Sequence, residues 1–137
     1  MFKTIMVPVD LAHLDKLAKA LGVASDLAKH YGAVVHYVGV TGTAPGSAAH
    51  SPEEFTEKLE TLAASRAQAD SADIRARTIV SHDPAVELEG SLRQAAEALN
   101  ADLVVMASHV PGFSEYVFSS HAGYLASHAS TSVFVVR

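Results

Sequence analysis

The sequence contains no cysteine and no tryptophan among its 137 residues. Without a thiol, disulfide frameworks, thiolate zinc sites, iron–sulfur clusters and cysteine nucleophiles are all excluded. Basic residues are also scarce, because 10 lysines and arginines stand against 15 acids and give a formal net charge of −5. Proteins that bind the phosphate backbone of nucleic acids normally carry a basic surplus. We therefore expect no nucleic-acid partner.

Long apolar runs are missing as well. The N-terminal segment MFKTIMVPVD contains a short apolar run that Pro8 and Asp10 interrupt, too short for the apolar centre of a signal peptide. No stretch approaches the roughly 20 apolar residues that a membrane span needs. We therefore expect a cytoplasmic protein with no membrane partner. Apolar residues still make up 49% of the chain, enough to bury the core of one domain covering residues 1–137.

Short runs rich in valine and isoleucine recur along the chain, and each has the length of a β-strand. The five runs are Thr4–Val9, Ala33–Val40, Ile74–Ser81, Leu103–Ala107 and Ser132–Val136. The first, second and fourth are almost continuously apolar, which is typical of parallel strands buried on both faces. The third alternates apolar residues with Arg75 and Arg77, which favours a place at an edge of the sheet.

Longer stretches rich in alanine, leucine and glutamate separate these runs and have apolar residues at helical spacing. We expect helices at Leu14–Tyr31, Pro52–Ser71, Pro84–Leu99 and His121–His128. Ser51 and Asp83 precede prolines as N-caps, and Gly32 and Asn100 are expected helix ends. The alternation of strands and helices predicts a doubly wound α/β sandwich. The segment Thr41–His50 is expected to form a flexible surface loop.

Ligands of open α/β sheets bind beyond the carboxyl ends of the strands, where the strand order reverses. The segments expected there are Pro8, Val9 and Asp10 after the first strand, Val40 and Thr41 after the second, and Ala107–Ser120 after the fourth. The carboxylate of Asp10 can hydrogen-bond a ribose hydroxyl or a base amine. It can equally cap the loop or helix that follows. The sequence leaves both interpretations open.

Ser119 and Ser120 directly precede the last predicted helix. Free amides and hydroxyls at a helix N-terminus can hold an anion, although the same serines can simply cap the helix. The segment Ala107–Ser120 contains no lysine or arginine. Only amides, hydroxyls, His109 or His121 and a divalent ion remain to hold a phosphate. This composition argues against fast phosphoryl transfer, which normally uses a positioned cation.

Four segments carry a more specific pattern: VPVD (Val7–Asp10), HDPA (His82–Ala85), ADLVVMASH (Ala101–His109) and the C-terminal His128–Arg137. With these segments the whole chain resembles the universal stress protein family. The form ASHVPG…YVFSSHAG is similar to the branch of the family that contains the F and G proteins of enteric bacteria. The resemblance implies a single-domain, Rossmann-like fold with a five-stranded, mainly parallel sheet in the order 3-2-1-4-5 and four helices.

Nucleotide-binding members of this family carry a loop of the form Gly-x-x-Gly followed further on by Gly-Ser or Gly-Thr. Here Ala107 stands at the first glycine, Val110 or Pro111 at the second, and Ser119 at the third, with Ser120 at the hydroxyl position. Glycine allows close approach of the backbone to phosphate and a positive φ, for which a β-branched valine is a poor substitute. Nucleotide binding and a degenerate site are therefore alternatives.

By resemblance, the ligand is an adenine nucleotide, ATP or AMP with or without Mg²⁺, in a regulatory role in the stress response. The residues implied to bind it are Pro8, Val9, Asp10 and Val40 at the adenine and ribose, together with Met106, Ala107, His109, Val110, Ser119, Ser120 and His121 toward the phosphates. No catalytic residue is expected, and a slow ATPase is the most that enzymatic activity would amount to. The alternative function is that of a nucleotide-free interaction protein.

The C-terminal run Ser132–Val136 is rich in valine and phenylalanine and would form a sheet edge. Exposed apolar edges invite pairing. The resemblance implies a homodimer in which this strand pairs with its two-fold mate, whereas the alternative is an edge covered by the protein's own loops. The sequence also leaves open whether the chain binds another protein, which it does not identify. The eight histidines show no pair with compelling ligand spacing, so no metal site is expected.

Overall fold

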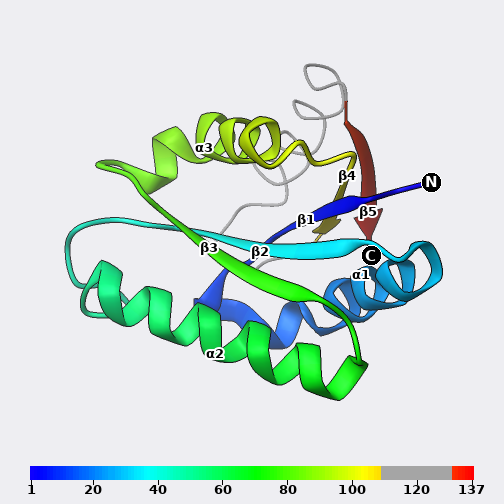
Figure 1. Ribbon diagram of the computed structural model, residues 1–137. Helices are drawn as coiled ribbons and strands as arrows, with labels where there is room; N and C mark the ends of the chain where they lie inside the picture. The colour runs from blue at the N-terminus through cyan, green and yellow to red at the C-terminus, as the bar shows by residue number, and fades with distance from the viewer. Residues whose placement is uncertain (109–130) are drawn as a thin grey trace.

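The computed structural model describes residues 1–108 and 131–137. Five strands form one sheet in the order β3-β2-β1-β4-β5, and every neighbouring pair is parallel (Figure 1). The strands are β1 (Thr4–Pro8), β2 (Val34–Thr41), β3 (Ile74–Val80), β4 (Leu103–Ala107) and β5 (Ser132–Val136). The predicted strand order, the parallel sheet and the edge position of β3 are confirmed.

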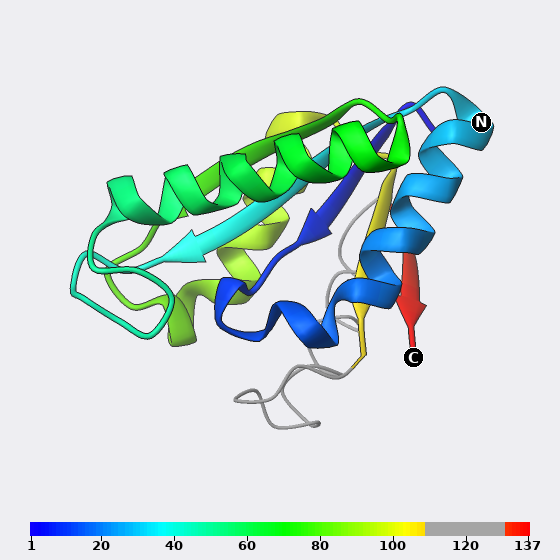
Figure 2. The ribbon, with the colours of Figure 1, turned by 90° about the horizontal axis from the view of Figure 1, so that it is seen from below.

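Helices cover both faces of the sheet. They are the 3-10 helix η1 (Leu11–Lys16) and the α-helices α1 (Ala18–Tyr31), α2 (Pro52–Asp70) and α3 (Pro84–Leu99). The helices α1 and α2 lie on one face and α3 lies on the other (Figures 1 and 2). This two-sided arrangement is the predicted doubly wound sandwich. The predicted helix at 121–128 lies outside the described residues.

The predicted caps of the helices are confirmed. The Ser51 hydroxyl accepts a hydrogen bond from the Glu54 amide at 3.1 Å, and the Asp83 carboxylate accepts one from the Val86 amide at 3.3 Å. Gly32 and Asn100 end α1 and α3 in the left-handed conformation, with φ of 68° and 52°. Each N-cap contributes about 1 kcal/mol to helix stability.

The start of the first helical segment differs from the prediction. The segment after β1 is a 3-10 helix, and the α-helix begins at Ala18 rather than at Leu14. His13 interrupts the helical geometry with φ −137° and ψ 45°. The reason is local, because the Asp10 side chain binds both the Ala12 amide and the His13 ring at this corner.

The centre of the sheet carries the core. Ile5, Met6 and Val7 of β1 are completely buried, and every residue of β4 is buried. Both faces of these strands are covered, which explains their continuous apolar runs. The two edge strands are more exposed and differ strongly from one another in side-chain chemistry.

Candidate functional site

The carboxyl ends of β1, β2 and β4 emerge at the same edge of the sheet, because the three strands are parallel neighbours (Figure 2). After β1 the chain passes to α1 on one face, whereas α3 leads into β4 from the opposite face. The strand order therefore reverses between β1 and β4. In sheets of this kind a ligand crevice forms at that point, beyond the carboxyl ends.

Six of the predicted binding residues lie at this edge. They are Pro8, Val9, Asp10, Val40, Met106 and Ala107. Val9, Met106 and Ala107 are buried, while the other three are partly exposed. The Val9 amide extends the β1–β2 ladder by donating to the Val38 carbonyl at 2.8 Å. These residues lie at the carboxyl ends of the strands, and a ligand could reach the partly exposed ones.

The other five predicted binding residues, His109, Val110, Ser119, Ser120 and His121, lie outside the described residues. The predicted short helix after them lies outside as well. The part of the candidate site expected to approach phosphates therefore stays a prediction. The described part is the side expected to hold the adenine and ribose.

Asp10 caps η1, which confirms one of its two interpretations. Its Oδ1 accepts a hydrogen bond from the Ala12 amide at 2.9 Å, and its Oδ2 lies 2.9 Å from Nδ1 of His13. The Asp10 side chain remains 25% exposed. An ionised carboxylate offers more than two acceptor positions. Capping therefore fixes the orientation of the carboxylate without using up its capacity to bind a further donor.

His13 is a site residue that the sequence reasoning missed. Its ring lies against Asp10 at the end of β1, and its side chain is 31% exposed. The available signal was the spacing of three residues from Asp10, which brings two side chains to the same side of a helical turn.

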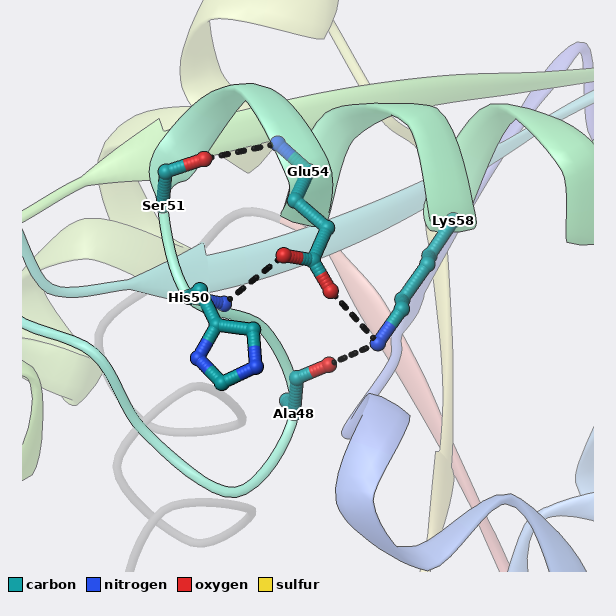
Figure 3. A network of polar contacts seen from close by, with 5 residues as sticks. All are labelled: Ala48, His50, Ser51, Glu54 and Lys58. Atoms are coloured by element: carbon teal, nitrogen blue, oxygen red, sulfur yellow. Dashed lines mark hydrogen bonds and ion pairs between the residues drawn. The ribbon is translucent and has the colours of Figure 1, made fainter.

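The loop between β2 and α2 lies at the surface as predicted, and its last residues are held by α2 (Figure 3). The Glu54 carboxylate accepts from the His50 amide at 3.1 Å, and the Lys58 ammonium lies 3.1 Å from that carboxylate. Lys58 also donates to the Ala48 carbonyl at 2.7 Å. The hydrogen bonds from Lys58 and from the His50 amide lower the pKa of Glu54.

An open groove of about 740 Å³ lies between η1 and α2, beside the corner that Asp10 caps. Its walls include Leu11 and Leu14 from η1, Leu62 and Lys58 from α2, and Ala48 from the loop. The sequence reasoning missed this groove, because its walls come from three segments that only the tertiary fold brings together.

The HDPA segment fixes the start of α3 in the described structure. Asp83 caps the helix, and Glu87 accepts hydrogen bonds from the Asp83 amide and the Ser81 hydroxyl, both at 3.0 Å. These two bonds lower the pKa of Glu87, the backbone bond contributing more. The amide of Ser81, the residue directly before this segment, donates to the Thr41 carbonyl at 2.8 Å and so supports the end of β2.

None of the helices in residues 1–108 is long and apolar enough to cross a membrane, nor is there one in residues 131–137. Within the same two ranges, no group of three or more His, Asp or Glu side chains could hold a metal ion.

The parallel sheet, the helices on both its faces and the reversal of strand order between β1 and β4 define a doubly wound α/β protein. The universal stress protein family model matches residues 1–137. The chain is also 34% identical over 148 residues to universal stress protein G of Escherichia coli O157:H7, with all of both chains covered. The chain belongs to the universal stress protein family, as its sequence motifs predicted.

Solved structures show the same fold. A universal stress protein in complex with cAMP matches with a TM-score of 0.70 and 21% identity, over 99% of this chain and 97% of that chain. The Archaeoglobus fulgidus protein in complex with dAMP matches with a TM-score of 0.70 and 20% identity, over 98% of each chain. An Arabidopsis thaliana family protein with AMP bound matches with a TM-score of 0.63 and 13% identity, over 98% of this chain and 90% of that one.

Proposed function

We propose that this protein binds an adenine nucleotide, ATP or AMP, in a regulatory rather than a catalytic role. The observation that carries the proposal is the reversal of strand order between β1 and β4, because ligands of such sheets bind beyond the carboxyl ends of the strands at this point. Support also comes from structures of the family that contain cAMP, dAMP or AMP. The nucleotide would report a metabolic state, and the protein would respond to its occupancy.

Pro8, Asp10 and Val40 are the described residues that we assign to the nucleoside. All three are partly exposed at the carboxyl ends of the strands, and the Asp10 carboxylate is held in one orientation by Ala12 and His13. A carboxylate so fixed can accept from a ribose hydroxyl or a base amine without an ordering cost. Ser119, Ser120 and the neighbouring histidines keep the assignment to the phosphates that the sequence suggested, with Mg²⁺ as an optional ion.

The test is calorimetry with AMP, ATP and ATP plus Mg²⁺ on the wild type and on Asp10→Asn. Loss of a hydrogen bond to a charged group is expected to weaken AMP binding by about tenfold or more. Asp26→Asn is the matched control, because Asp26 is an exposed acid on α1 whose ion pair with Lys29 lies away from the edge. Thermal unfolding of Asp10→Asn separates a binding defect from loss of the cap.

The outcomes are distinct. Wild-type protein that binds none of the three ligands, and that releases no nucleotide detectable by mass spectrometry when freshly purified and denatured, would overturn the proposal. If Asp10→Asn binds AMP as tightly as the wild type, the nucleotide site excludes Asp10 and the assignment of that residue is wrong.

A second function, that of a dimeric interaction protein, is favoured by the surface of β5. Phe134 and Val135 are 45% and 42% exposed, although both are large apolar residues on a sheet edge. We propose that β5 (Ser132–Val136) pairs with its counterpart in a second copy, which would cover these side chains. This homodimer is compatible with nucleotide binding, and it would be the remaining function if the site proved degenerate.

A further inference from the structure

The strand β3 presents an unpaired backbone edge. At the two ends of the strand, the Asp73 carbonyl accepts from the Val35 amide at 2.9 Å and the Ser81 amide donates to the Thr41 carbonyl at 2.8 Å. Successive residues of a strand point their backbone N–H and C=O groups to opposite sides. Because the odd-numbered Asp73 and Ser81 face β2, the even-numbered residues between them point these groups outward. Among the described residues, none of those groups bonds to the backbone of another element. An extended chain could therefore add to this edge.

Two arginines lie along this edge on one face of the sheet. Arg75 is in register with His36 of β2, and Arg77 is in register with Val38. Residues two apart on a strand share a face, so both arginines lie on the same side. That side is opposite α2, because Thr78 bonds to Thr56 of α2 through their hydroxyls at 2.9 Å. Both arginines are exposed.

The positive charge of this edge is only partly balanced. Arg75 contacts Asp73 through two nitrogens, at 3.0 and 3.2 Å, and both side chains are more than half exposed. Arg77 has no ion pair with any residue in the described ranges 1–108 and 131–137. The edge therefore attracts negative charge, and Arg77 is its most available anchor.

A second copy of this chain is a poor occupant of the β3 edge. Pairing two such edges would bring arginines of one copy near those of the other, and like charges opposite one another destabilise a sheet. A strand with acids at alternate positions fits instead. Alternate residues of an extended chain repeat every ~6.6 Å, which matches the separation of Arg75 and Arg77 along β3.

We propose that the β3 edge binds an extended acidic segment of a partner protein as an added strand. The backbone of the segment pairs with the outward groups of Ile74, Ala76, Thr78 and Val80, and carboxylates at alternate positions meet Arg75 and Arg77. This surface lies at the far edge of the sheet from β5 and does not depend on the nucleotide proposal.

The test adds a ten-residue synthetic peptide of alternating glutamate and threonine to the full-length protein at moderate salt. NMR of the protein then measures binding. Binding as an added strand is expected to slow hydrogen exchange at the amides of Ala76 and Thr78. A peptide with lysine in place of glutamate is the charge control and should not bind. The imidazole of His36, beside Arg75 in the register, should titrate at higher pH when carboxylates lie close by.

Two variants move the affinity in opposite directions. Arg77→Gln is expected to weaken binding of the acidic peptide by about fivefold, whereas Asp73→Asn frees Arg75 and should strengthen it by about twofold to fivefold. Lys29→Gln and Asp26→Asn are matched controls, because they remove the same charges from an exposed ion pair on α1. All four substitutions change exposed side chains, so unchanged thermal unfolding is expected and confirms that each variant is folded.

The following outcomes would overturn the proposal. One is equal affinity of Arg77→Gln and Lys29→Gln for the acidic peptide. Others are equal binding of the lysine peptide, exchange protection at β5 instead of β3, or no peptide binding by the wild type at millimolar concentration. Protection of the β3 amides by raising the protein concentration alone would assign the edge to a second copy and would likewise reject an acidic partner.

Discussion

The two edges of the sheet carry opposite chemistry although they belong to the same parallel ladder. The edge strand β3 has seven residues, with arginine at two of the three exposed positions. The edge strand β5 has five residues without a single charge, and Phe134 and Val135 are exposed. Charged residues on an edge discourage pairing with another sheet, and apolar residues invite it. This difference predicts that β3 resists pairing with a second copy and that β5 accepts it.

The largest effect is expected from giving β5 the kind of charge that β3 already has. Val135→Lys should convert a dimer to monomers, because two lysines would be brought together in an interface that buries apolar side chains. The expected loss is about 2 kcal/mol or more, hence a dissociation constant at least about thirtyfold higher. Sedimentation velocity over a concentration series measures this.

Val80→Lys is the matched control on the other edge, because Val80 is 51% exposed and Val135 is 42% exposed. Since β3 is not the proposed dimer edge, this control should leave the oligomeric state unchanged. A Val135→Lys protein that remains as dimeric as the wild type would show that β5 does not form the dimer interface. A wild type that is monomeric at all concentrations would do the same.

The reverse change should make the β3 edge prone to self-association. Replacing both arginines, Arg75→Val with Arg77→Val, would leave a strand of seven residues with no charge and an unpaired backbone edge. Such an edge is a predicted aggregation site. We expect self-association visible by light scattering at concentrations where the wild type is stable.

The matching control removes two positive charges from exposed positions on helices, through Lys16→Val and Lys29→Val. If that variant aggregates as readily as the β3 variant, net charge rather than the edge explains the solubility. If Arg77→Asp or Arg77→Glu beside Arg75→Val does not aggregate, charge of either sign at this position protects the edge.

The local features of the fold could be predicted from the sequence, and the contrast between the edges was partly visible there. Strand and helix bounds follow from apolar spacing and from caps such as Ser51 and Asp83, which act within a few residues. The alternation around Arg75 and Arg77 likewise predicted that β3 is an edge. These signals are local, so a single sequence carries them.

Other features depend on contacts that spacing does not encode. The delayed start of α1 results from the contact of Asp10 with His13, which overrides the apolar pattern from Leu14 onward. The groove beside η1 has walls from η1, the loop and α2, and within it Lys58 bonds to the Ala48 carbonyl ten residues earlier. For Asp10 itself, the sequence allowed a cap or a contact with a ligand, and the folded structure shows that the cap is made.

The smallest expected effect is a pH-dependent loss of stability, which arises because the arginines of β3 act on His36 of β2. Burial lowers the pKa of His36, Arg75 and Arg77 lower it further, and Asp73 opposes them. The folded state therefore resists protonation of His36, while the unfolded chain takes up the proton near the ordinary pKa of about 6.5. Stability contributed by neutral His36 is present above that pH and is lost as the pH falls toward the lowered folded pKa.

His36→Gln should consequently lose less stability than the wild type between pH 7 and pH 5.5, as measured by denaturant unfolding at each pH. The variant Arg77→Gln should raise the pKa of His36 in an NMR titration, because one of the repelling charges is removed. His30→Gln is the control, since that histidine lies on α1, away from both arginines. If the stability of His36→Gln and of the wild type depends on pH in the same way, the charged edge of β3 does not destabilise its neighbouring strand, and its arginines do not act on His36.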